Sequence, residues 1–146
     1  MRGKLLLVLG LSLLPGADAP EDAREELKRL QGTWVMAALE IDGRQVPDDQ
    51  LRDTTLTIKG DKYIVKSKGK TYEATFTLDP GQSPKAIDLL FPDGTNAPKK
   101  GAGIYKLEGD TFTLCRRQAP GQDRPAQFGT WPDTGLYLVT WQRHKP

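Results

Sequence analysis

The strongest strand signal in the chain is the segment Thr71-Tyr72-Glu73-Ala74-Thr75-Phe76-Thr77-Leu78. Every second side chain in it is apolar or aromatic, and polar side chains, mostly threonines, stand between them. A period of two is typical of a β-strand that has one face in a hydrophobic core and the other in water. The segment therefore predicts a half-buried strand.

The same alternation recurs on both sides of this segment. Leu56 and Ile58 alternate with threonines, and so do Phe112 and Leu114. Dipeptides that tolerate positive φ separate successive runs and predict hairpins; they are Asp42-Gly43, Gly60-Asp61, Lys68-Gly69 and Gly109-Asp110. We predict strands over residues 33–41, 44–46, 54–59, 62–67, 70–78, 86–91, 101–107, 111–116 and 136–143.

Sequential strands that are joined by hairpins, with no helical crossover, imply an antiparallel up-and-down meander. Such a meander hides its edges by closing on itself, so we predict an all-β barrel over residues 32–146. Residues 20–31 predict a short amphipathic helix before it, since acidic residues come early and Lys28 and Arg29 come late. The Pro/Gly-rich loops 79–85, 92–100 and 118–132 are expected to be mobile and to frame the open end.

Residues 1–19 have the pattern of a secretory signal peptide. Arg2 and Lys4 precede the apolar run 5–14, and Ala17-Asp18-Ala19 supplies a cleavage signal. The run is too short to span a membrane, and no cysteine near the cleavage point could carry a lipid. We expect cleavage after Ala19 and a soluble, monomeric product in the periplasm or outside the cell.

Composition argues against several classes of function. Removal of residues 1–19 lowers the net charge from +2 to +1, and the basic residues are scattered rather than gathered among aromatics. Nucleic-acid binding has little support for this reason. Cys115 is the single cysteine, so no internal disulfide can form. One histidine and one cysteine are too few for a zinc site, and we expect no metal and no cofactor.

Two residues are candidates for catalysis. His144, the single histidine, stands near the C-terminus and is a poor candidate for a general base. Cys115 falls on the same strand face as Thr111 and Thr113, and the cations that follow it could lower its pKa and make it reactive. Packing of an inert thiol beneath a loop is the preferred interpretation, and we expect no catalytic residue.

Several blocks of the mature chain, in order, resemble an uncharacterised family of small exported domains abundant in planctomycete bacteria. The blocks are residues 30–34, 42–43, 46–47, 59–63, 84–89, 103–111, 114–115 and 124–125. The resemblance covers nearly all of the mature chain. It implies an exported, lipocalin-like β fold and implies no activity.

Gly32-Thr33-Trp34 also resembles the Gly-x-Trp motif of the lipocalin group. That resemblance implies a tryptophan at the closed end of the barrel, beneath a basic side chain from the last strand. Arg143 is the first candidate for this partner and Arg116 the second. The pair would have a structural role, through a cation–π contact at the barrel floor.

The aromatic side chains could fill the barrel or line a pocket, and the sequence leaves both open. The first hypothesis is a non-enzymatic binding or interaction module that takes a small apolar ligand, or a protein, at the open end. The second is a structural or inhibitory envelope protein with a filled core. The third is a thiol enzyme that uses Cys115. The pattern identifies no ligand-binding residue.

Overall fold

The computed structural model describes residues 20–92 and 99–146. The predicted signal peptide and part of the predicted loop 92–100 lie outside these residues. The described residues form one α-helix, α1 (Glu21–Leu30), and a single 3-10 turn at Asp48–Gln50. Their strands are β1 (Gly32–Ile41), β2 (Arg44–Gln45), β3 (Thr55–Lys59), β4 (Lys62–Ser67), β5 (Lys70–Asp79), β6 (Ala86–Phe91), β7 (Lys99–Glu108), β8 (Thr111–Arg117) and β9 (Leu136–Arg143).

The strands form a closed antiparallel barrel, which confirms the predicted fold class. Neighbours follow chain order from β3 to β9, and β1 lies between β3 and β9. β1 pairs with β3 over its first four residues and with β9 along most of its length. Eight strands therefore close the barrel, and the two-residue strand β2 adds only to the end of β1.

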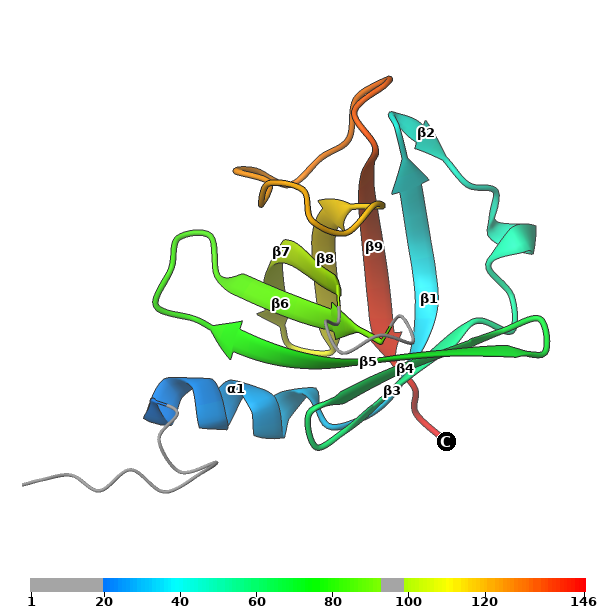
Figure 1. The fold of residues 1–146 in the computed structure, drawn as a ribbon. Coiled ribbons are helices and arrows are strands. Elements are labelled where there is room, and N and C mark those ends of the chain that lie inside the picture. Colours follow the sequence, from blue (N-terminus) through cyan, green and yellow to red (C-terminus); the bar gives the residue numbers. More distant parts are fainter. Residues whose placement is uncertain (1–19, 93–98) are drawn as a thin grey trace, which may run out of the picture.

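A β-bulge between Met36 and Ala38 interrupts the pairing of β1 with β9. It stands just beyond Val35, the last residue of β1 that pairs with β3. A bulge bends a strand and increases its twist. This bend lets β1 follow β3 at one end of the barrel and β9 at the other, as Figure 1 shows.

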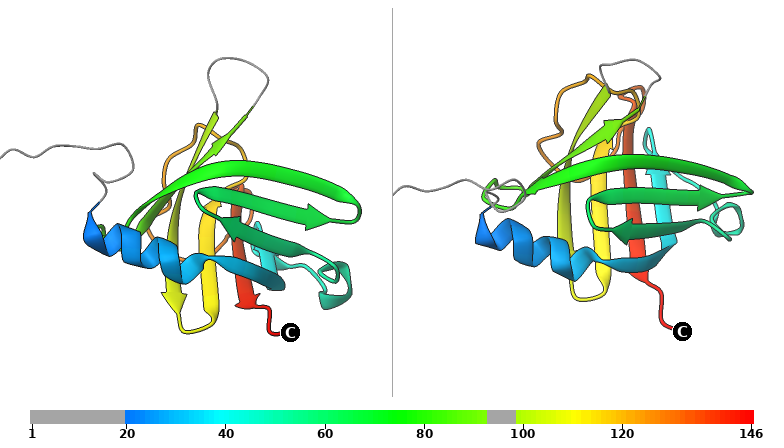
Figure 2. Two further views of the ribbon diagram at one scale, coloured as in Figure 1. Left: turned by 90° about the horizontal axis from the view of Figure 1, so that it is seen from below. Right: turned by 60° about the horizontal axis from the view of Figure 1, so that its bottom comes forward.

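Helix α1 lies across the lower end of the barrel in Figure 1, the end that is seen from below in the left view of Figure 2. Its predicted apolar face is turned inward: Ala23 and Leu30 are buried, and Leu27 packs against the core. The core behind it consists of inward-facing strand residues, among them Trp34, Phe112 and Trp141. The helix therefore forms the floor of the barrel.

Trp34 and Arg143 pair at this floor, as the Gly-x-Trp resemblance implies. The Arg143 guanidinium carbon is 4.3 Å from the Trp34 ring centroid, and the indole Nε1–H donates to Leu30 O at 2.9 Å. Arg143 also donates to the backbone oxygens of Arg29 and Gln31 at 2.5 and 2.9 Å. Because these two oxygens belong to the last turn of α1 and to its C-cap residue, Arg143 joins α1 to the last strand.

Glycine is required at residue 32. Its φ is +121°, and a Cβ there would lie 3.3 Å from Arg143 Nη1. A side chain at this position would be strained by the positive φ and would crowd the guanidinium. The glycine of the motif is thus explained by the close approach of Arg143.

The loops differ in two respects from the sequence expectation. Successive hairpins alternate between the barrel ends, so the loop 79–85 lies at the helix end, where Lys85 contacts Glu26. It does not frame the open end. The loop 118–132, expected to be mobile, is tied to the barrel wall: Arg124 donates to Ile87 O, Gly103 O and the Asp88 carboxylate at 3.1, 2.9 and 2.8 Å.

Replacing Arg143 tests the floor. We expect Arg143→Met to lower the free energy of unfolding by about 1–3 kcal/mol, because the cation–π contact and the charged hydrogen bonds to two carbonyls are lost. Chemical denaturation measures this change. Lys145→Met is the matched control, since exposed Lys145 pairs with Asp110 but does not contact Trp34. If both variants lose the same free energy of unfolding, the contacts of Arg143 at the floor do not stabilise the fold.

Candidate functional site

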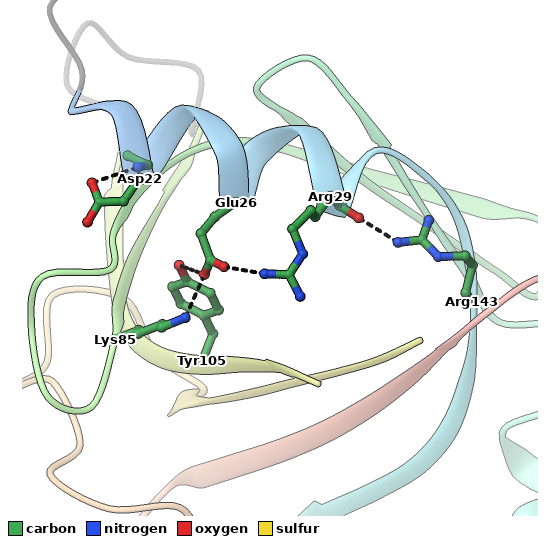
Figure 3. Close-up of polar contacts among 7 residues, drawn as sticks. Asp22, Glu26, Arg29, Lys85, Tyr105 and Arg143 are labelled. Carbon is green, nitrogen blue, oxygen red and sulfur yellow. Dashed lines mark hydrogen bonds and ion pairs between the residues drawn. The ribbon is translucent and has the colours of Figure 1, made fainter. Parts of the chain in front are cut away.

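A buried carboxylate lies beneath the helix. Glu26 is 5% exposed and points from α1 toward the barrel wall (Figure 3). Its Oε1 accepts from the Tyr105 hydroxyl at 2.7 Å and from Lys85 Nζ at 3.0 Å, and its Oε2 accepts from Arg29 Nη1 at 3.0 Å. The carboxylate charge is therefore paired and hydrogen-bonded.

This cluster fixes the helix to the barrel. Glu26 is one turn from the buried Ala23 and Leu30, and Tyr105 projects from β7. Burial, and then the hydrogen bond to Glu26, raise the pKa of Tyr105. A phenol that stays protonated remains a donor to the carboxylate, so the cluster has a structural role at neutral pH.

Glu26→Gln tests the cluster. We expect it to lower the free energy of unfolding by about 1–3 kcal/mol, because charge-assisted hydrogen bonds to Tyr105 and Lys85 become weaker. Glu25→Gln is the control, because Glu25 pairs with Lys28 at the exposed surface of the same helix. If Glu26→Gln lowers the free energy of unfolding no more than the control does, the cluster does not contribute to stability.

The pH dependence gives a second readout of the same variant. The pKa of Tyr105 is raised in the folded chain, so its contribution is present below the ordinary value of 10.0 and is lost at higher pH. In Glu26→Gln the native tyrosinate absorbance should appear at lower pH than in the unchanged protein. If the tyrosinate absorbance of Glu26→Gln appears at the same pH as in the unchanged protein, the hydrogen bond between Tyr105 and Glu26 is contradicted.

Cys115 is packed beneath the loop 118–132. It is fully buried on the outer face of β8, in a cluster with Ile104 and Leu136, and Phe128 of the loop packs on this cluster. Its Sγ lies 3.6 Å from Gly129 O. Burial raises the pKa of Cys115, and this effect outweighs the lowering by the Gly129 hydrogen bond and by the charge of Arg117. The geometry is that of an inert packed thiol, the preferred interpretation of the sequence.

Thiol labelling tests this burial. We expect native Cys115 to react with a maleimide at neutral pH roughly a hundredfold more slowly than the unfolded chain, because the loop must open first. Phe128→Ala, which removes the ring above the thiol, should speed labelling of the folded protein. Rapid labelling of the unchanged native protein would contradict the assignment.

The other end of the barrel is less completely buried. The side chains that pack against the core there are half-buried and apolar or aromatic; they are Met36, Leu39, Val65, Phe91 and Tyr137. Tyr72 shares the inward face of β5 with Ala74 and Phe76 but is 57% exposed. We call these six side chains the apolar rim. They give solvent access to the inward face of the sheet.

Among the described residues, a charged side chain, that of Arg116, lies within this rim. Arg116 follows Phe112 and Leu114 on the inward face of β8, directly opposite Tyr137 of β9. Its guanidinium carbon lies 4.9 Å from the Tyr137 ring centroid and 5.2 Å from that of Phe91. Nη1 donates to Arg117 O at 2.8 Å and, at 3.3 Å, to the next carbonyl. The second candidate partner of Trp34 is thus at the opposite end from it.

Two glycines of β7 make room for this arrangement. A Cβ at Gly101 would lie 2.9 Å from a Phe91 ring carbon and 3.8 Å from Arg116 Cδ. A Cβ at Gly103 would lie 3.3 Å from Arg116 Cβ. Both glycines are buried on the inward face, so Phe91 and Arg116 take the space that side chains of β7 would fill.

Three more polar groups lie near Arg116 inside the barrel. Burial raises the pKa of Tyr63 and of Tyr137, and the charge of Arg116 opposes both shifts. The fully buried Trp141 approaches the Tyr63 hydroxyl closely enough to lower the pKa of Tyr63, but its Nε1–H forms no hydrogen bond of normal geometry. The interior below the apolar rim therefore combines apolar walls with a few polar groups.

The other residues considered from the sequence do not join this site. His144 follows β9 at the closed end, where its backbone N–H donates to Thr33 O at 2.9 Å. Cys115 lies on the outer face of the wall whose inner face bears Arg116. Within residues 20–92 and 99–146, no three His, Cys, Asp or Glu side chains gather in a way that could hold a metal ion.

Sequence reasoning did not place Glu26 or Arg116 as interior residues. Both positions had a signal: Glu26 is three residues after Ala23 on the helix, and Arg116 continues the alternation of Phe112 and Leu114. Neither signal is specific, because a charged residue at such a spacing is usually exposed to solvent.

Fold and site together define a small eight-stranded barrel with a helix across its floor and an apolar rim at its other end. Comparison with protein-family models, with curated proteins and with solved structures found no match. No helix in the part of the chain that the structure describes is long and apolar enough to cross a membrane.

Proposed function

We propose that the mature chain is an exported, non-enzymatic binding module that takes a small apolar ligand at the open end of a lipocalin-like barrel. The observation that carries this proposal is the difference between the two ends. At the floor, Trp34 and Leu30 are fully buried, whereas the apolar rim is half-buried or exposed. Binding sites for small molecules are typically apolar and contain a few placed polar groups.

Export rests on the signal-peptide pattern of residues 1–19 and on the family resemblance. The same pattern and the absence of an early cysteine support release of a soluble product, which we take to be a monomer. In this proposal the module works in the periplasm or outside the cell. There it would carry, or sequester, a ligand that is poorly soluble in water.

A structural or inhibitory protein with a filled core is the second candidate. It is favoured by the lower half of the barrel, where aromatic rings pack closely: Phe112 lies 5.8 Å from Trp34 and 6.2 Å from Tyr105, centroid to centroid. Such a protein would use its outer surface or loops. It would not need an accessible inward face at the open end.

Native mass spectrometry separates the two candidates. The mature protein, purified from its own exported fraction, should carry a bound small molecule that is absent from the denatured mass. Val65→Trp places a large ring at the apolar rim and should abolish the bound mass. Ile64→Trp changes the neighbouring, outward-facing residue of β4 and should retain it.

Either of two results would contradict the binding proposal. One is a bare monomer mass for the unchanged protein together with no uptake of an added apolar dye. The other is equal retention of the bound molecule by both tryptophan variants. The first result would favour the filled-core protein, and the second would place the bound molecule away from the apolar rim.

A further inference from the structure

Among the described residues, two buried hydrogen-bond donors in the barrel interior form no hydrogen bond of normal geometry. Arg116 Nε lies near the open end, whereas Trp141 Nε1 lies deeper, because Trp141 is opposite Phe112, and its indole approaches the Tyr63 hydroxyl. Leaving such a group unpaired costs about 1–3 kcal/mol, and folded proteins contain few of them. An acceptor that enters this region from outside would recover that cost.

The same region has a positive charge without a counter-charge. No carboxylate of the described residues forms an ion pair with Arg116; its printed partners are two carbonyl oxygens and two aromatic rings. By contrast, Arg124 and Arg143 each pair with an aspartate. A single inward-facing guanidinium matches one negative charge.

The surroundings limit what can bear that charge. Arg116 lies between the aromatic rings of Phe91 and Tyr137 in sequence-distant strands, within the apolar rim. The hydroxyls of Tyr63 and Tyr137 are held protonated by burial and can donate hydrogen bonds. Every polar side-chain group identified here is a donor or can act as one, so the complementary ligand group is an acceptor.

From this geometry we propose that Arg116 and Trp141 form an anion site inside the barrel, and that the ligand is a monocarboxylate with an apolar body. The inference rests on the proposed function and adds the chemical class of the ligand. The carboxylate would accept from Arg116 and from the indole N–H. The apolar body would lie along Met36, Leu39 and Val65. The exposed lysines at the β4–β5 turn add positive charge at the same end.

The test is calorimetric titration of the full mature chain with decanoate, decanol and methyl decanoate. The three probes share an apolar chain and differ in the charge at one end. We expect decanoate to bind roughly tenfold to a hundredfold more tightly than the neutral probes. Acetate has the charge without the apolar chain and should not compete at equal concentration.

Variants assign the effect to residues. Arg116→Gln should reduce decanoate affinity to that of decanol and leave decanol binding unchanged. Arg117→Gln is the matched control, because Arg117 is the next residue of β8, faces outward and donates to Thr134 O at 2.8 Å. It should not change either affinity. If Arg116→Gln does not fold, Arg116→Lys retains the charge and should preserve part of the preference for decanoate.

Trp141→Phe provides a readout that a purely structural role would not give. The ring is kept and only the unpaired N–H is removed, so the ligand-free protein should be as stable as the unchanged one, or more stable. Decanoate affinity should nevertheless fall several-fold. Unchanged affinity in this variant together with unchanged affinity in Arg116→Gln would overturn the anion site.

The probes also separate this inference from the proposed function. Equal binding of decanoate, decanol and methyl decanoate would leave the apolar binding module standing and overturn the carboxylate. Binding of none of the three would overturn both. Competition by acetate at equal concentration would overturn the apolar body of the ligand.

Discussion

The pairing of β1 with β9 is the interaction on which the rest of the structure depends. It closes eight strands into a barrel, and its first pair, Trp34 with Arg143, lies over the floor. Arg143 joins that pair to the end of α1 through two backbone oxygens. One guanidinium therefore connects the first helix, the first strand and the last strand, and the bulge in β1 lets the same strand serve both ends.

Much of this architecture could be predicted because it depends on local patterns. Alternation and turn dipeptides fix where strands begin and end, and the Gly-x-Trp resemblance pointed to the pair of Trp34 and Arg143. The burial of individual charged side chains could not be predicted, because it depends on which residues surround them in the fold. Glu26 and Arg116 have the spacing of inward residues, but a charge is buried only where partners meet it from distant strands. The burial of Cys115 likewise depends on how the loop 118–132 packs against the outer face of the barrel.

The two ends of the barrel differ in how completely their interior charged and polar groups are hydrogen-bonded. At the floor, each charged group found in the interior has partners: Glu26 has three donors, and Arg143 has two carbonyls and a ring. Between the floor and the open end, Arg116 and Trp141 each retain an N–H that forms no hydrogen bond of normal geometry with the described residues. The contrast suggests that one end is built for stability and the other accepts a cost to stability in the ligand-free state. A site that binds by completing its own hydrogen bonds has this property.

Because β1 and β9 close the barrel, their pairing must come late in folding. The residues that meet at the floor are among the first and the last of the barrel, so this contact spans almost the whole domain. The hairpins between them can form locally, but the floor cannot be finished until the final strand has been synthesised. Contacts of such long sequence separation slow folding, and a chain that lacks β9 leaves the edges of β1 and β8 unpaired. The incomplete chain is thus the aggregation-prone form. Pairing of β9 with β1 and β8 covers the exposed edges and removes that risk.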